Sequence, residues 1–344
     1  MLAMLWCCSN MIAQDYFPEN DGVKSKNNNY TAFTNAKIFV TPSQVIEGGT
    51  LLLQNGKVKQ VGKSVSLPNN TIIVDVKEHS IYPSFIDVYS NFGVEQPKRK
   101  PGGGRAAQYD SDREGFYWND HIMPENTAIE KFKYDDKKAK ELRNAGFGVV
   151  NTHIHDGIVR GTGVLVALNG AGGDANRILD DSSAQYLSFS RSVVKGQSYP
   201  TSLMGAMALL RQMYSDAKWY AAGNSDTKDR SLEALNQNKS LVQFFEAKDK
   251  GHVLRADKIG DTNGIQYAIV GGGDEYERIS DIKATGAKLV LPINFPDAYD
   301  VTNPYAANMI NLKDRRHWTQ VPSNPKVLAE SEVSFALTIY DLKS

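Results

Sequence analysis

The fold of this chain is decided by a strand that begins at residue 84 and reads SFIDVYS. Further short apolar runs follow it, and stretches with helical periodicity separate them. The six runs cover residues 84–90, 148–154, 240–247, 266–272, 288–294 and 334–339. Buried strands that alternate with helices are typical of a parallel sheet or barrel with helices on its outside.

The helical stretches support the same α/β architecture. They cover residues 135–146, 201–223 and 274–286, and the last ends at Gly286, a common residue just after a helix. A closed (β/α)₈ TIM-like barrel needs eight strands, and six are found here. We therefore expect an incomplete barrel over residues 81–344 and a chain that is a fragment of a longer protein.

The segment before the barrel has the pattern of a small β module. Apolar residues flank Asn55-Gly56, which is a strong signal for a two-residue hairpin turn. Strand-like runs precede and follow this hairpin. Residues 31–80 are therefore expected to form a separate β segment.

The N-terminus has the pattern of an export signal. Residues 1–13 carry no charged side chain, are mostly apolar, and are too few to cross a bilayer as a helix. We interpret them as a signal peptide and residues 14–30 as a linker, with a buried N-terminal strand as the alternative. The mature chain is then periplasmic or secreted and has no membrane span.

Composition excludes several functions. Lys plus Arg and Asp plus Glu both number 39, so the net charge gives no field that favours nucleic acid or an anionic membrane. The only cysteines are Cys7 and Cys8, which excludes a Cys-ligated zinc site or a Cys nucleophile from the rest of the chain. No G-x-S-x-G motif is present, so a serine hydrolase has no nucleophile of that kind.

The hairpin and the strand after it resemble a known family. A hairpin of this kind, followed by Pro83-Ser84-Phe85-Ile86-Asp87, is similar to the start of the amidohydrolase superfamily, and closest to its imidazolonepropionase-like branch. The resemblance covers most of the chain from Thr31 onward. It implies a metal-dependent hydrolase barrel with an N-terminal part of a composite β domain, acting on carbon–nitrogen bonds other than ordinary peptide bonds.

The same resemblance shows that the family's metal ligands are replaced. Its first barrel strand has the form P-G-[FL]-[IV]-D-x-H-x-H, with two histidines that bind a divalent metal. Here the histidine positions hold Tyr89 and Asn91, and only Asp87 remains. Tyrosine and asparagine are poorer zinc ligands than histidine.

Two later strands differ from the family in the same way. The segment FEAKDKGHVLRA has Glu246 and Lys248 where the family has histidines, and Gly271 stands in place of another. Glu246 and Lys248 are expected to form either a structural ion pair or a buried acid/base pair. We interpret Asp87, Tyr89, Asn91, Glu246, Lys248 and Gly271 as a pocket that has lost its metal, and expect no cofactor.

One alternative metal site is present. His153 and His155 lie at i and i+2 near the end of a strand, which is a spacing that two zinc ligands use. Together with Asp87 and Glu246 they form a possible rearranged site for zinc or another divalent metal. The other interpretation is a pair of hydrogen-bonded structural histidines.

Two other motifs have residues that an anion site could use. The sequence IVGGGDEYE, residues 269–277, resembles a glycine loop that holds a phosphate before a helix, but its acidic residues favour a simple strand-to-helix turn. Residues 96–126 have the pattern of an inserted surface loop. This loop contains a basic cluster of Lys98, Arg99, Lys100 and Arg105.

Three functions remain open from the sequence. The first is a catalytically inactive amidohydrolase relative that pairs with an active amidohydrolase domain or subunit. The second is an active hydrolase with a metal held by His153 and His155. The third is a periplasmic ligand-binding or structural module that binds a small molecule at the barrel mouth.

Overall fold

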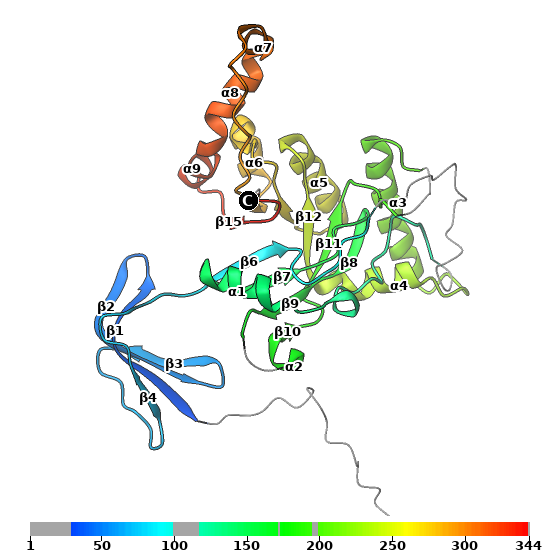
Figure 1. The fold of residues 1–344 in the computed structure, drawn as a ribbon. Helices are drawn as coiled ribbons and strands as arrows, with labels where there is room; N and C mark the ends of the chain where they lie inside the picture. The colour runs from blue at the N-terminus through cyan, green and yellow to red at the C-terminus, as the bar shows by residue number, and fades with distance from the viewer. Residues whose placement is uncertain (1–28, 99–116, 171–172, 195–198, 343–344) are drawn as a thin grey trace, which may run out of the picture. The chain divides into compact units, whose positions relative to one another are not determined.

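The computed structural model describes residues 29–98, 117–170, 173–194 and 199–342 (Figure 1). These residues form two compact units. The first is a β module of residues 29–83 with helix α2 (Asp174–Arg177), and the second contains the remaining residues. The predicted signal peptide lies outside the described residues, as do Arg99, Lys100 and Arg105.

The β module is a single sheet in the order β3-β2-β1-β4, with a short fifth strand that also pairs with β1. Its strands are β1 (Tyr30–Thr41), β2 (Gln44–Gln54), β3 (Lys57–Gly62), β4 (Ile72–Asp75) and β5 (Ser80–Ile81). The turn between β2 and β3 has φ values of 52° at Asn55 and 71° at Gly56. Positive φ at both central residues is what the predicted hairpin turn requires.

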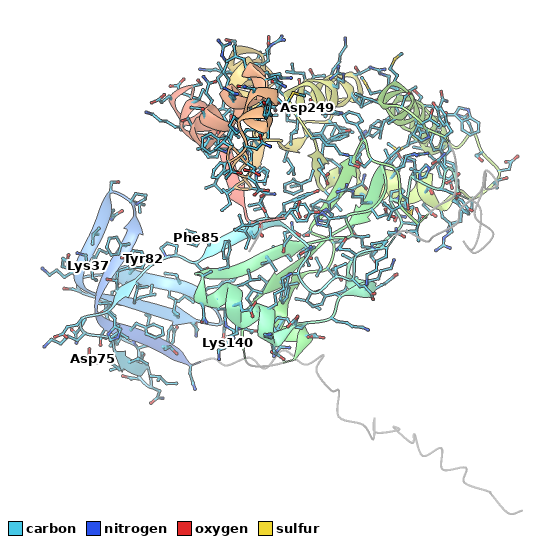
Figure 2. The ribbon with its side chains drawn as sticks, turned by 45° about the horizontal axis from the view of Figure 1, so that its top comes forward. Lys37, Asp75, Tyr82, Phe85, Lys140 and Asp249 are labelled. Carbon is cyan, nitrogen blue, oxygen red and sulfur yellow. The ribbon has the colours of Figure 1, made fainter. Side chains whose placement is uncertain are left out.

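Side-chain contacts join β1 to β4 and to the residue that follows β5, the two strands that pair with it in parallel. The Tyr82 ring stacks on Phe39 with centroids 4.3 Å apart, and Asn35 donates to the Asp75 carboxylate at 3.0 Å. Figure 2 labels Tyr82 and Asp75 in this module. Buried alanines and aliphatic residues on β1 and β2 form the small core of this sheet.

The second unit contains ten strands in two sheets, in the orders β10-β9-β7-β6 and β15-β14-β13-β12-β11-β8. The strands of the first sheet are β6 (Phe85–Ser90), β7 (Phe147–Thr152), β9 (Val164–Ala167) and β10 (Ile178–Asp180). Those of the second are β8 (Val159–Thr162), β11 (Ala184–Ser188), β12 (Val242–Glu246), β13 (Ala268–Val270), β14 (Lys288–Pro292) and β15 (Phe335–Thr338).

The two sheets enclose a common interior without forming a closed barrel. Only Gly163 separates β8 from β9, so one stretch of chain pairs with β11 in one sheet and β7 in the other. At the opposite side, β15 lies beside β6, and the Thr338 hydroxyl contacts Asp87 Oδ1 at 2.7 Å and the Tyr89 carbonyl at 2.9 Å. These are side-chain bonds, and no backbone ladder joins β15 to β6 among the described residues.

Helices cover the outer face of the six-stranded sheet. They are α3 (Leu203–Ala221), α4 (Arg230–Gln237), α5 (Lys250–Asn263), α6 (Ile279–Ala284) and α9 (Asn324–Glu330). Their buried side chains pack in one cluster with strand residues such as Leu187, Phe245 and Leu289. Because side chains alternate along a strand, Phe244 and Glu246 face the interior instead.

The remaining helices are short. They are α1 (Asp136–Asn144), α7 (Pro304–Met309) and α8 (Leu312–Gln320), with 3₁₀ turns at Ile129–Lys131, Asn238–Ser240, Glu275–Arg278 and Val321–Ser323. No helix in the described part of the chain is long and apolar enough to cross a membrane.

Two sequence expectations differ from the structure. Strands β8, β9, β10 and β11 were not among the six predicted runs. The sequence of β11, AQYLS, mixes polar and apolar residues and so lacks a strand pattern. The predicted surface loop, residues 96–126, is not all surface. His121 and Ile122 are buried, and Ile122 forms a bridge with Val159 of β8, so this end of the loop is part of the core.

Candidate functional site

An ion pair between Arg160 and Glu246 lies at the carboxyl ends of β6 and β12, next to the amino end of β8. Arg160 Nη1 donates to Glu246 Oε2 at 2.7 Å and to the Tyr89 hydroxyl oxygen at 2.9 Å. The Tyr89 hydroxyl in turn donates to the same Glu246 oxygen at 2.6 Å. Strand β8 supplies Arg160, β6 supplies Tyr89 and β12 supplies Glu246, so the triangle joins three strands.

The three groups of this triangle stabilise one another through an ion pair and hydrogen bonds. Burial alone would raise the pKa of Glu246, but the Arg160 guanidinium and the two hydrogen bonds outweigh it and hold that pKa at about 2. Burial raises the pKa of Tyr89 well above its ordinary value, although Arg160 opposes this. The triangle therefore contains a carboxylate, a guanidinium and a neutral phenol that can donate its proton.

Asp87 belongs to the same strand but has other partners. It is buried, and its Oδ1 accepts from Thr338 Oγ1 at 2.7 Å and from the Tyr89 backbone N–H at 3.2 Å. Burial raises the pKa of Asp87, against the effect of these two hydrogen bonds. Its role in this geometry is to join β6 to β15.

Five rings stack in a column through the interior, in the order Phe244, Tyr186, His153, His155 and Tyr340. Successive centroids lie 5.2, 3.5, 3.8 and 4.3 Å apart, and the planes differ by 9°, 5°, 30° and 14°. Tyr89 meets this ring column nearly at right angles, with its centroid 4.9 Å from that of His155. The two predicted histidines are therefore neighbours of Tyr89, and aromatic rings lie on both sides of the pair.

Gln96 holds the backbone of the two histidines. Its Oε1 accepts from the His155 N–H at 2.7 Å, and its Nε2 donates to the His153 carbonyl at 3.2 Å. His155 Nε2 lies 3.0 Å from the Ser90 carbonyl, so this nitrogen carries the proton. Within the described residues, His155 Nδ1 and both ring nitrogens of His153 have no hydrogen-bond partner.

Both histidines are neutral in this environment. Burial, followed by the nearby Arg160 charge, lowers the pKa of His155 to about 3. Burial and then His155 and Arg160 lower the pKa of His153 well below its ordinary value. Neutral imidazoles are suitable metal ligands, so protonation does not by itself exclude a metal.

The arrangement of the donors does not fit a divalent metal. Zinc ligands converge on one point with tetrahedral geometry, whereas the lone pairs of stacked rings run side by side. The buried guanidinium of Arg160 adds a positive charge that would repel a metal ion in this interior. In the part of the chain that the structure describes, no three residues of the types His, Cys, Asp and Glu are grouped to hold one.

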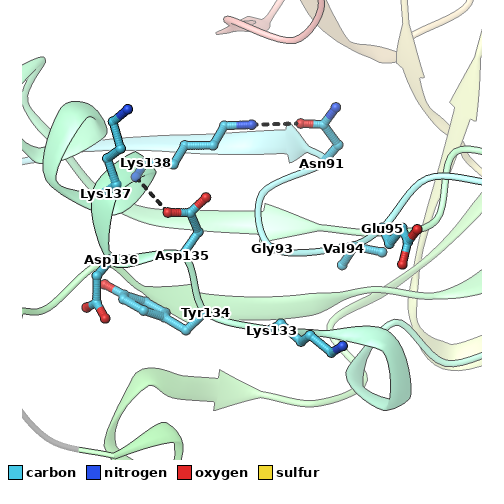
Figure 3. Close-up of a pocket in the computed structure, with 10 residues that line it drawn as sticks. All are labelled: Asn91, Gly93, Val94, Glu95, Lys133, Tyr134, Asp135, Asp136, Lys137 and Lys138. Carbon is cyan, nitrogen blue, oxygen red and sulfur yellow. Dashed lines mark hydrogen bonds between the residues drawn. The ribbon is translucent and has the colours of Figure 1, made fainter.

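Asn91 and Lys248 lie apart from this cluster. Strand β6 ends at Ser90 and its pairing with β7 is irregular after Asp87, so the alternation that orients Tyr89 does not extend to Asn91. Asn91 instead lines a pocket of about 710 Å³ beside α1, where Lys138 Nζ lies 3.5 Å from its side-chain oxygen (Figure 3). Lys248 is exposed, and the cation that pairs with Glu246 is Arg160.

Gly271 has a steric role in the glycine loop. A side-chain Cβ at this position would lie 2.2 Å from Glu275 Oε1. That oxygen accepts from Gly272 N at 2.8 Å and Gly273 N at 3.2 Å, and Asn324 donates to the other oxygen at 2.7 Å. The anion in this loop is thus the chain's own buried carboxylate, and the loop is a turn rather than a phosphate site.

Four residues of this interior were not predicted from the sequence: Arg160, Tyr186, Thr338 and Tyr340. Arg160 carried one signal, since it is the only charged residue in the apolar run IVRGTGVLV, residues 158–166, and a charge in a buried strand needs a partner. The other three carry no such signal, because tyrosine and threonine are ordinary strand residues.

No family profile and no curated protein matches this sequence. Solved structures do match. An amidohydrolase from Thermotoga maritima aligns over 91% of this chain and 79% of its own, with 19% identity and a TM-score of 0.66. A prolidase solved with N-methylphosphonate-L-proline aligns over 90% and 78%, with 12% identity and a TM-score of 0.43. The first likeness shows that this chain has the fold of an amidohydrolase.

Proposed function

We propose that this chain is an inactive relative of the amidohydrolases, in which an internal ion pair replaces the metal of a metal-dependent hydrolase. One observation carries the proposal: the Arg160 guanidinium binds both Glu246 and Tyr89. By the family resemblance, Glu246 and Tyr89 stand where metal ligands would be. Without a metal to activate water, hydrolysis of a carbon–nitrogen bond loses its main source of acceleration.

The role that we propose is structural, in an exported protein that pairs with an active amidohydrolase domain or subunit. The ring column favours this over a ligand-binding module, because its rings contact one another in the space where a small molecule would bind. A ligand-binding module would instead be stabilised by a small molecule without turning it over.

A metal analysis tests the proposal. The mature chain, residues 14–344, is incubated with excess zinc, passed through a gel-filtration column, and analysed for metal content and thermal midpoint. We expect no stoichiometric metal and no change in the midpoint. A bound ion that raises the midpoint would contradict the proposal, because ligands that bind the folded state stabilise it.

The second candidate is an active hydrolase with a metal at His153 and His155. The observation in its favour is that both ring nitrogens of His153 are buried without a partner among the described residues. If zinc is bound, the His153→Ala/His155→Ala variant should lose it. The variant His79→Ala/His317→Ala, which changes histidines outside the cluster, should keep it.

A further inference from the structure

Helices α7 and α8, between β14 and β15, form an arm of residues 304–320. Figure 1 shows them in orange, projecting beyond the other helices of this unit. Neither helix has a buried residue. Tyr276 fixes the base of the arm, with its hydroxyl 3.1 Å from His317 Nδ1, and Arg315 binds the Ala307 carbonyl and ties α8 to α7. The arm is therefore an ordered extension that contributes nothing to the core.

Large apolar side chains are exposed at the end of this arm. Tyr305 and Met309 are each 84% exposed and Leu312 is 62% exposed. Tyr305 and Met309 lie one turn apart on α7, and Leu312 opens α8 across a two-residue connection. Exposed apolar clusters of this kind mark surfaces that bind a partner or a membrane.

Positive charge accompanies these apolar residues. Residues 304–320 contain three basic side chains, Lys313, Arg315 and Arg316, and one acidic side chain, Asp314, so the local formal charge is +2. The Asp314 carboxylate accepts from Asn311 Nδ2 at 2.6 Å. The formal charge of the whole chain is zero, so the overall composition does not reveal the local positive charge of the arm.

We propose that the arm binds an anionic lipid surface, with Tyr305, Met309 and Leu312 entering the interface and the basic residues of α8 contacting lipid phosphates. Apolar and aromatic residues next to lysine and arginine are the chemistry of interfacial helices. A second copy of the chain fits less well, because a two-fold contact between arms would bring two positively charged surfaces together. This surface function does not depend on whether the interior site is catalytic.

Vesicle flotation with the full chain tests the proposal. We expect binding to vesicles of phosphatidylglycerol and phosphatidylcholine, and much weaker binding to phosphatidylcholine alone. The variant Tyr305→Ser/Met309→Ser/Leu312→Ser should lower the partition coefficient at least about tenfold, because the apolar area is lost. The variant Lys313→Ala/Arg316→Ala should lower it by about tenfold or more on anionic vesicles and far less on neutral ones.

Met204→Ser is the matched control, since Met204 on α3 is 81% exposed but lies outside the arm. It should bind vesicles as the unchanged protein does. Absence of vesicle binding overturns the proposal, and so does equal loss in Met204→Ser. A concentration-dependent dimer in gel filtration that the triple variant abolishes, without vesicle binding, would assign the arm to a second copy instead.

Discussion

Arg160 Nη1 lies 2.7 Å from Glu246 Oε2, and the two side chains form an ion pair. The guanidinium is buried, and the glutamate side chain retains 23% of its exposure. A buried pair of this kind adds little net stability when intact, because desolvation offsets the attraction. Its importance is that neither charge can be removed alone without leaving the other unpaired.

Replacing Arg160 with methionine should therefore destabilise the fold. We expect Arg160→Met to lower the free energy of unfolding by about 3 kcal/mol, the lower end of the range for broken buried pairs, because water partly reaches Glu246. Urea denaturation measures the loss. The double variant Arg160→Met/Glu246→Gln should recover much of it, since no buried charge is then unpaired.

Lys283→Met is the control for this experiment. Lys283 also pairs with a carboxylate, Glu332, at 3.2 Å, but both side chains are largely exposed. Exposed pairs contribute little, so the urea midpoint should not change. An equal shift in the two variants would show that burial of the Arg160 pair has no particular effect.

Acid should destabilise the protein through the ring column. The pKa of His155 is about 3 in the folded state and the pKa of His153 is also lowered, whereas an unfolded histidine has its ordinary pKa of about 6.5. Between these values the unfolded state binds more protons, so stability falls as the pH drops below 6.5. The loss is up to about 1.4 kcal/mol per pH unit for each histidine.

Glu246 extends the same trend to lower pH. Its pKa is about 2 in the folded state and 4.5 in the unfolded state, so the stability that it contributes is present above pH 4.5 and is lost as the pH falls toward 2. Urea midpoints measured between pH 7 and pH 5 avoid the range of Glu246, and comparison with histidine variants separates the histidines from other groups that titrate there. The His153→Gln/His155→Gln variant should show a shallower slope, whereas the exposed His79→Gln should follow the unchanged protein. Parallel curves for all three proteins would rule out this linkage.

The local parts of the fold could be predicted from the sequence. The Asn55-Gly56 turn and the strand at residues 84–90 depend on neighbouring residues, so the local pattern is sufficient. The alternation along β12 likewise places Phe244 and Glu246 on one face. What that face contacts depends on residues far away, since Arg160 is 86 positions from Glu246. A single sequence does not show such a pairing.

Asn91 and Lys248, two site residues taken from the family motif, do not lie where the i and i+2 spacing predicts. Positions i and i+2 face the same way only while the strand continues. Strand β6 ends one residue before Asn91, and Lys248 lies beyond the end of β12. Tyr89 and Glu246 were predicted as pocket residues, and both face the interior. Lys248 was the wrong partner for Glu246, because the ion pair is formed with Arg160.

Gly271→Ala should destabilise the glycine loop. The new Cβ would displace Glu275 Oε1, and the buried carboxylate would lose bonds from Gly272 and Gly273. We expect a loss of about 2–4 kcal/mol in the free energy of unfolding, from at least one unsatisfied buried group. In a Glu275→Ala background the same change should have a much smaller effect, as a double-mutant cycle would measure.

Gly62→Ala is the matched control, because the nearest atom to its Cβ would be 3.8 Å away and its φ is not positive. It should leave the urea midpoint nearly unchanged. Additive effects of Gly271→Ala and Glu275→Ala would contradict the steric explanation.

Thr338→Val tests the contact that holds β15 beside β6. The change preserves shape but removes the hydroxyl that contacts Asp87 and the Tyr89 carbonyl. Because Thr338 is buried, we expect a loss of about 1–3 kcal/mol and faster amide hydrogen exchange in β15. Thr302→Val removes a similar bond, to Asp300 at 2.6 Å, from an exposed loop and should leave both measurements unchanged. If β15 exchanges at the same rate in both variants, backbone pairing with β14 alone holds that strand in place.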